Sequence, residues 1–203
     1  MTRATQILRE GRKALEDFNL LKVLQSEISH ELSSNSFQDI KSSSLGDFVL
    51  DWNSAQSHDV VLRRKSESGE EVAVSALLGQ ETRDSEGKFP REVLMKVCVR
   101  KPGLSSMLQF DCGVSEKDVH RSDFNIHSAY YLQSSTIPNS SIYRGPSFSS
   151  LDPRLQDAFK EYLLARGIGE NLTNFLLLTL HKKEQGQYVN WLQILESFVA
   201  KDE

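Results

Sequence analysis

The sequence predicts an α+β fold in which a long helix precedes an antiparallel sheet and two further helices follow it. Apolar residues recur at helical spacing near both ends of the chain. Between residues 46 and 132 they alternate with polar residues, which is typical of half-buried strands. Short turn signals separate the alternating segments and favour an antiparallel meander. Because 203 residues can bury a single core, we expect one domain over residues 1–203.

The first predicted helix covers residues 1–32. Its charged residues gather opposite one apolar stripe, on which Gln25 also falls. An amphipathic helix of this kind needs a partner surface. Residues 1–13 hold four basic groups and one acid, a balance also typical of the end of an organelle-targeting segment. The stripe consists of Ala4, Ile7, Gly11, Ala14, Phe18, Leu21, Ile28 and Leu32.

A serine-rich connector over residues 33–45 leads into the predicted sheet at residues 46–132. We expect six or seven strands, with turns at Glu67–Gly69, Asp84–Gly87 and Lys101–Gly103. Val49, Val61 and Leu77 point to the opposite face, where neighbouring subunits would shelter them. The predicted core face carries Phe48, Leu50, Trp52, Val60, Leu62, Val72, Val74, Ala76, Leu78, Val93, Met95, Val97, Val99, Leu108, Phe110, Cys112, Val114, Phe124, Ile126 and Tyr130.

Two helices are predicted over residues 152–200. Asp152 and Pro153 supply an N-cap acceptor and a first-turn proline, and Gly167 supplies a stop signal. The second helix begins near Asn171 and has a single weak point at Gly186. The economical packing places these helices on one face of the sheet.

The composition excludes several classes of protein. Lys and Arg number 24 against 28 Asp and Glu, a net charge of −4, which argues against a nucleic-acid binder that works by neutralising phosphates. Two cysteines are too few for a disulfide-stapled secreted domain. The apolar runs are far shorter than the ~20 residues of a membrane-spanning helix, so no membrane span is expected.

Cys98 and Cys112 flank a predicted hairpin but should not form a disulfide. Placing the apolar faces of the two strands together sets Cys112 opposite Val97 and leaves Cys98 on the other face. We therefore expect two free thiols.

No motif for catalysis, metal binding or a cofactor is present, so we expect no catalytic, metal or cofactor site. The five histidines lack metal-ligand spacing. One alternative is a small hydrolase or ligand-binding enzyme with a site between sheet and helices, using His127 with Asp123 or Asp111. Another is an RNA-associated factor, whose only basic clusters would be Arg63-Arg64-Lys65 and Arg100-Lys101.

The carboxy-terminal residues carry a family resemblance. They read Ser150-Leu151-Asp152, Leu155, Tyr162-Leu163, Arg166-Gly167-Ile168, Tyr188, Trp191-Leu192, Leu195 and Ser197-Phe198-Val199. Together with the hairpin from Val93 to Cys112, this order resembles the mitochondrial acidic matrix glycoprotein family, which includes the complement globular-head-binding protein. The resemblance implies a seven-stranded twisted antiparallel sheet, with the first and last helices packed together. It also implies a doughnut-like homotrimer.

The resemblance further implies a non-enzymatic, multi-partner adaptor or chaperone-like protein of the mitochondrial matrix. Its roles would be in mitochondrial translation, ribosome assembly and oxidative phosphorylation, with ribosomal or respiratory assembly factors and other basic proteins as partners. Any cleaved presequence is expected to precede this chain. The acidic loops here are shorter than in some relatives, so strong binding to cationic proteins is not expected. The predicted partner-facing acids are Glu67, Glu70, Glu71, Asp84, Glu86, Glu116 and Asp118.

Overall fold

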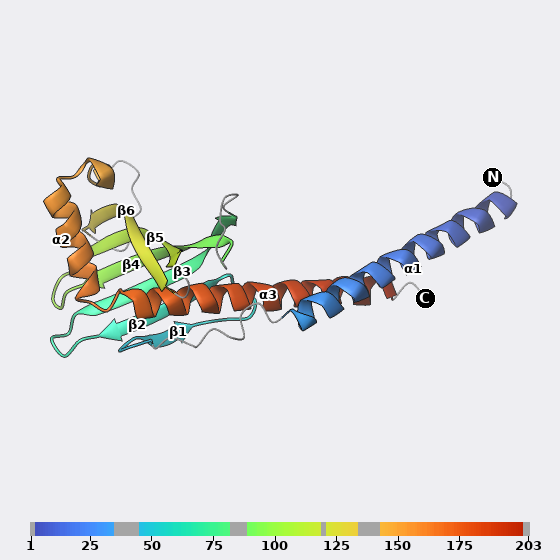
Figure 1. Ribbon diagram of the computed structural model, residues 1–203, viewed down its shortest axis with the longest axis horizontal. Coiled ribbons are helices and arrows are strands. Elements are labelled where there is room, and N and C mark those ends of the chain that lie inside the picture. Colours follow the sequence, from blue (N-terminus) through green and yellow to red (C-terminus); the bar gives the residue numbers. More distant parts are fainter. Residues whose placement is uncertain (1–2, 35–44, 82–88, 119–120, 134–142, 201–203) are drawn as a thin grey trace. The chain divides into compact units, whose positions relative to one another are not determined.

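The structure, a computed structural model, describes residues 3–34, 45–81, 89–118, 121–133 and 143–200. The described residues contain the predicted elements in the predicted order (Figure 1). They are α1 (Arg3–Ser33), β1 (Val49–Trp52), β2 (Asp59–Lys65), β3 (Glu71–Glu81), β4 (Arg91–Arg100), β5 (Met107–Asp118), β6 (Arg121–Leu132), the 3₁₀ turn η1 (Phe148–Ser150), α2 (Pro153–Leu164) and α3 (Glu170–Ala200). The α+β prediction is confirmed, and six strands are present in this part of the chain. Most of the serine-rich connector and the predicted turn at Asp84–Gly87 lie outside the described residues.

The chain divides into two compact units. One comprises residues 40–181 and the other residues 1–39 with 182–203. The continuous helix α3 belongs to both units. The expectation of a single domain over residues 1–203 stays a prediction.

The first unit is an antiparallel meander with helices on one face. Its strands are ordered β1-β2-β3-β4-β5-β6, so every strand pairs with its neighbour in sequence. α2 and the first half of α3 lie against one face of the sheet (Figure 1). The alternating apolar side chains of β2 to β6 are buried on this face. From α2, α3 and the turn between them, this core contains Leu163, Ile168, Leu172, Leu176, Leu177 and Leu180.

A polar cluster fixes the start of α3 on β6. The hydroxyls of Ser122 and Thr173 lie 2.7 Å apart, and the Ser122 hydroxyl donates to Oδ1 of Asn174 over 2.6 Å. Arg121 pairs with Glu170 at 3.5 Å beside them. Ser122 and Thr173 are buried, so their mutual hydrogen bond avoids the cost of an unsatisfied polar group.

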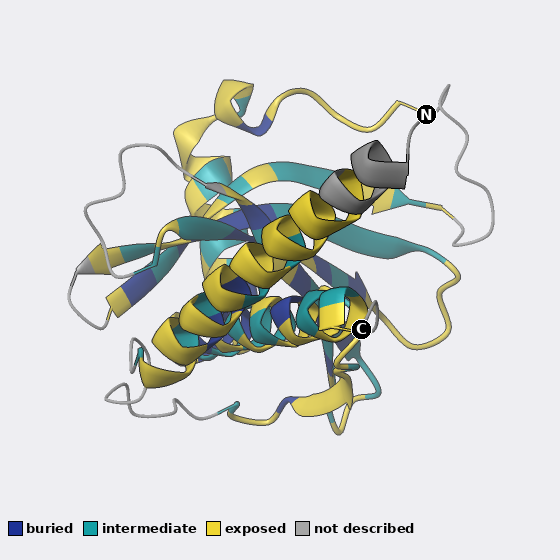
Figure 2. Cartoon of the chain, turned by 90° about the vertical axis from the view of Figure 1, so that its right-hand side faces the viewer, coloured by how far each residue is buried: buried dark blue, intermediate teal, exposed yellow. Residues whose placement is uncertain are grey.

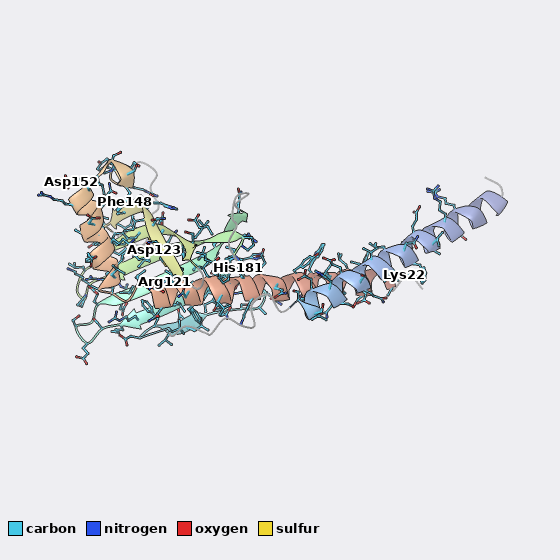
Figure 3. The ribbon with its side chains drawn as sticks, viewed as in Figure 1. Lys22, Arg121, Asp123, Phe148, Asp152 and His181 are labelled. Atoms are coloured by element: carbon cyan, nitrogen blue, oxygen red, sulfur yellow. The ribbon has the colours of Figure 1, made fainter. Side chains whose placement is uncertain are left out.

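Local signals set both ends of α2 as predicted. Asp152 caps the helix by accepting a hydrogen bond from the backbone N–H of Arg154 over 2.9 Å (Figure 3). At the other end Gly167 has a φ of 83°, and the N–H of Ile168 donates to the carbonyl of Leu163. A left-handed residue followed by such a bond is the Schellman stop, which favours glycine.

The burial prediction for the first strand is wrong. Phe48 is buried just before β1, but Leu50 and Trp52 are 42% and 52% exposed. β1 is the edge strand, and its register shifts between these two residues. An edge strand has one neighbour only, so alternation alone does not bury its side chains.

The second unit pairs α1 with the far half of α3. Leu24, Ile28 and Leu192 form a buried cluster, with Leu195 and Val199 packed on it. Gln25 donates to Glu196, and the Tyr188 hydroxyl donates to Glu27, so the two helices run antiparallel. The implied packing of first and last helices is therefore confirmed.

The predicted stripe of α1 is only partly buried. Leu24 is buried and Gln25 exposed, whereas the sequence pattern placed Gln25 on the stripe. Phe18 and Leu32 are also exposed, and Figure 2 shows mostly exposed residues along the helix. Gln25 pairs with Glu196 near the end of α3, so the part of α1 that precedes it, including Phe18, extends past its partner helix.

Candidate interaction surface

The sheet has one face that α2 and α3 leave uncovered, which we call the outer face. It carries the residues that alternate with the buried ones. Val49, Leu77 and Leu94 are exposed there, at 68%, 41% and 43%. Leu77 and Leu94 are direct cross-strand partners on β3 and β4. Val49, Leu77 and half-buried Val61 all lie on the face predicted for them.

The two basic clusters of the sequence meet on this face. Strand pairing places Lys65 opposite Glu71, and Glu71 opposite Arg100. Glu71 lies 2.6 Å from Arg100 and 3.3 Å from Lys65, and hydrogen bonds from these two cations lower the pKa of its carboxyl. Arg63 donates to Asp51, which raises the pKa of the guanidinium. Local acids thus neutralise much of the basic charge.

A groove of about 510 Å³ opens between these charged groups. Its lining includes Ala73 and Cys98, which are cross-strand partners with short side chains. Val49 and Met107 add apolar walls from β1 and β5. The sequence did not predict this groove. It forms because two small residues, Ala73 and Cys98, lie opposite each other in the pairing of β3 with β4, and that pairing is not visible in the sequence.

The predicted partner-facing acids do not share one environment. Glu67 is exposed at the turn between β2 and β3. Glu70, in contrast, pairs with Arg166 at 2.8 Å, and both side chains are less than one-fifth exposed. Glu116 is half-buried on β5. Asp84, Glu86 and the side chain of Asp118 lie outside the described part of the chain.

The residues of the enzyme alternative do not form a catalytic pair. His127 is exposed and lines a hollow of about 480 Å³ with residues of β6, η1 and α2. Asp123 (Figure 3) instead accepts hydrogen bonds from Lys160 and from the N–H of Phe124, which lower its pKa against the effect of burial. Asp111 accepts a hydrogen bond from Gln109. Apolar side chains fill the core between the sheet and the helices, while the hollow beside His127 opens between β6 and α2.

Both cysteines are free, as predicted. Cys112 faces the core and Cys98 the outer face, but Cys112 lies opposite Met95, and Phe110 lies opposite Val97. The expected register was wrong by two residues, a slip that keeps every side chain on its face. Burial raises the pKa of the Cys112 thiol to about 12 and also raises that of Cys98.

The described residues contain no group of three or more His, Cys, Asp or Glu side chains arranged to hold a metal ion. None of their helices combines the length and apolarity needed to cross a membrane.

A family profile and two related sequences point to the same protein family. The profile of the mitochondrial glycoprotein family (MAM33) matches residues 24–199. The mitochondrial acidic protein mam33 of Schizosaccharomyces pombe is 26% identical, covering 89% of this chain and 77% of that protein. An uncharacterised mitochondrial protein of Arabidopsis thaliana is 23% identical, covering 90% of this chain and 74% of its own length.

Two solved structures share the fold. The crystal structure of the Trypanosoma brucei p22 protein matches with a TM-score of 0.70 and 21% identity. A Leishmania major protein of unknown function, described as a homologue of human p32, matches with a TM-score of 0.70 and 17% identity. Each comparison covers 91% of this chain and 99% of the other.

Proposed function

Because the chain belongs to the mitochondrial glycoprotein family, we propose that it is a non-enzymatic homotrimer of the mitochondrial matrix that acts as a multi-partner adaptor or chaperone-like factor. In this role it supports mitochondrial translation, ribosome assembly and oxidative phosphorylation. The observation that carries the proposal is the outer face of the sheet. A face with exposed apolar residues and paired charges is typical of a protein-binding surface.

Assembly into a trimer would use part of this face. Leu77 and Leu94 present adjacent apolar side chains that a single chain leaves in water. Closed symmetry would shelter the same patch in every subunit. Light scattering and native mass spectrometry at micromolar concentration test this step, and a mass of one chain would contradict it.

Charge would guide the choice of partner. Three chains of −4 each carry −12, which attracts basic proteins at low to moderate salt. Among the acids, exposed Glu67 is available to a partner, whereas Glu70 is held by Arg166. Partner binding should therefore depend on Glu67 and not directly on Glu70.

The decisive experiment is affinity capture from mitochondrial matrix at two salt concentrations. Ribosomal proteins or respiratory assembly factors should be retained at low salt and released at high salt. Glu67→Gln should reduce their recovery. Glu70→Gln is the matched control, and its thermal stability is checked because it leaves Arg166 without its carboxylate. Recovery of neither class of protein at low salt would refute the adaptor function.

A further inference from the structure

The groove on the outer face is a small cavity with an apolar floor and a charged rim. Its depth arises because Ala73 and Cys98 are short, while the register surrounds them with longer side chains. On the same row, Arg63 and Gln109 flank them across the neighbouring strands. The volume of about 510 Å³ lies within the range of roughly 300–1,000 Å³ that small-molecule sites occupy.

The charge balance of the rim is positive, although the whole chain is negative. The lining contains the cations Arg63, Arg64, Lys65 and Arg100 and the single acid Glu71. Asp51 pairs with Arg63, and Asp47 pairs with Arg64 at 3.2 Å from outside the groove. Lys65 and Arg100 then share one carboxylate, which leaves about one unit of positive charge at this end of the groove.

The backbone at the floor of the groove is already paired within the sheet. Ala73 and Cys98 lie on β3 and β4, which pair with strands on both sides. No free strand edge is available there for an added peptide strand. An occupant must therefore be recognised by its apolar body and its charge.

We propose that this groove binds a small amphipathic anion, an apolar chain that ends in a carboxylate. The chain lies on Ala73, Cys98, Val49 and Met107, and the carboxylate accepts hydrogen bonds from Lys65 and Arg100 beside Glu71. A single carboxylate matches the single excess charge of the rim. The groove lies within residues 49–107 of one chain, so the proposal does not depend on the adaptor function.

Cys98 provides a direct reporter of occupancy. Its thiol is half-buried on the floor of the groove, while Cys112 is 2% exposed in the core. Alkylation by iodoacetamide at about pH 8.5, followed by peptide mass spectrometry, measures the two thiols separately. Octanoate is the probe, added to the full chain below its micelle concentration, with the oligomeric mass recorded alongside.

The expected result is saturable protection of Cys98 by octanoate. At ten times its dissociation constant, bound octanoate should slow alkylation about tenfold. Acetate lacks the apolar chain, octan-1-ol lacks the charge and octylamine has the opposite charge, so none of them should protect at the same concentration. Equal protection by octan-1-ol, or no protection by octanoate, would overturn the proposal. So would a Cys98 that does not react even without ligand, because the groove would then be filled by another part of the protein.

Two variants that change the charge of the rim in opposite directions distinguish recognition of the carboxylate from a general loosening of the sheet. Arg100→Gln should weaken octanoate binding about two- to fivefold, and Glu71→Gln should strengthen it by a similar factor, because the competing carboxylate is gone. Ala73→Leu should abolish protection by filling the groove. Lys96→Gln, on the same face outside the groove, is the control and should leave octanoate binding unchanged. Its protection is compared with its own alkylation rate without ligand, because the charge of Lys96 favours the Cys98 thiolate. A shift in the same direction for Arg100→Gln and Glu71→Gln would contradict the proposed site.

Discussion

His181 is a buried imidazole in the core of the first unit (Figure 3). Its Nδ1–H donates to the carbonyl of Leu177 over 2.8 Å, and its ring lies 4.9 Å from that of Phe89. Burial lowers the pKa of His181, and Arg91 adds to this effect. The Leu177 carbonyl and Glu116 oppose it. His181 is therefore neutral in the folded chain at neutral pH.

This burial predicts an acid-sensitive stability. In the unfolded chain His181 takes up a proton below about pH 6.5, while the folded chain resists protonation. The unfolded state then binds more protons, so the free energy of unfolding should fall as pH decreases from about 6.5. Chemical denaturation at several pH values should show a weaker pH dependence for His181→Leu. His127→Gln, at an exposed histidine, is the control. If the free energy of unfolding of His181→Leu depended on pH as strongly as that of the parent chain, His181 would not be the source of the acid sensitivity.

At the scale of elements, two glycines of the C-terminal helices have opposite roles. Gly167 adopts a φ of 83° at the stop of α2, with Arg64 and Phe48 close to the position of a Cβ. Gly186 lies within α3, and a Cβ there would meet nothing within 4 Å. The same substitution should therefore change stability in opposite directions.

Gly167→Ala should destabilise the chain by about 1–2 kcal/mol, because the left-handed conformation is strained for alanine. Gly186→Ala should stabilise it by about 0.5–1 kcal/mol, because alanine loses less conformational entropy in a helix. Denaturant midpoints of the two variants against the parent chain give both values. Destabilisation by Gly186→Ala would indicate that an assembled partner packs against that position.

Element type and order could be predicted from sequence because periodicity and caps are local. The stops at Gly69, Gly103 and Gly167 all have positive φ, as turn and cap chemistry requires. Burial was less predictable at the edges. Leu50 and Trp52 follow the strand pattern but lie exposed on β1, because their burial depends on a neighbour that the pattern cannot specify.

At the scale of the whole molecule, the proposed trimer places Leu77 in a contact between chains. Leu77→Glu should shift the mass measured by light scattering towards a single chain, because three charges would otherwise be buried. Ser75→Ala, on the same strand and face, should leave the mass unchanged. A Leu77→Glu variant that keeps the mass of the parent would exclude Leu77 from the contact.

The candidate surface illustrates what a sequence leaves open. The two basic clusters lie far apart in the sequence, yet Lys65 and Arg100 share Glu71 through the register of three strands. Glu67 and Glu70 belong to one turn, yet Glu67 is exposed and Glu70 pairs with Arg166, 96 positions away in the turn after α2. Long-range partners of this kind follow from packing and not from local pattern.

The sequence by itself determined the α+β class, the order of helices and strands, the face of each cysteine and the likeness to the mitochondrial glycoprotein family. These depend on periodicity, caps and ordered residues, all of which act over a few positions. The tertiary structure alone decided the strand register, the partners of the acids and the groove over Ala73 and Cys98. Shifting one strand by two residues leaves every side chain on its face but changes all of its cross-strand partners. Only the packed sheet could therefore fix these partners.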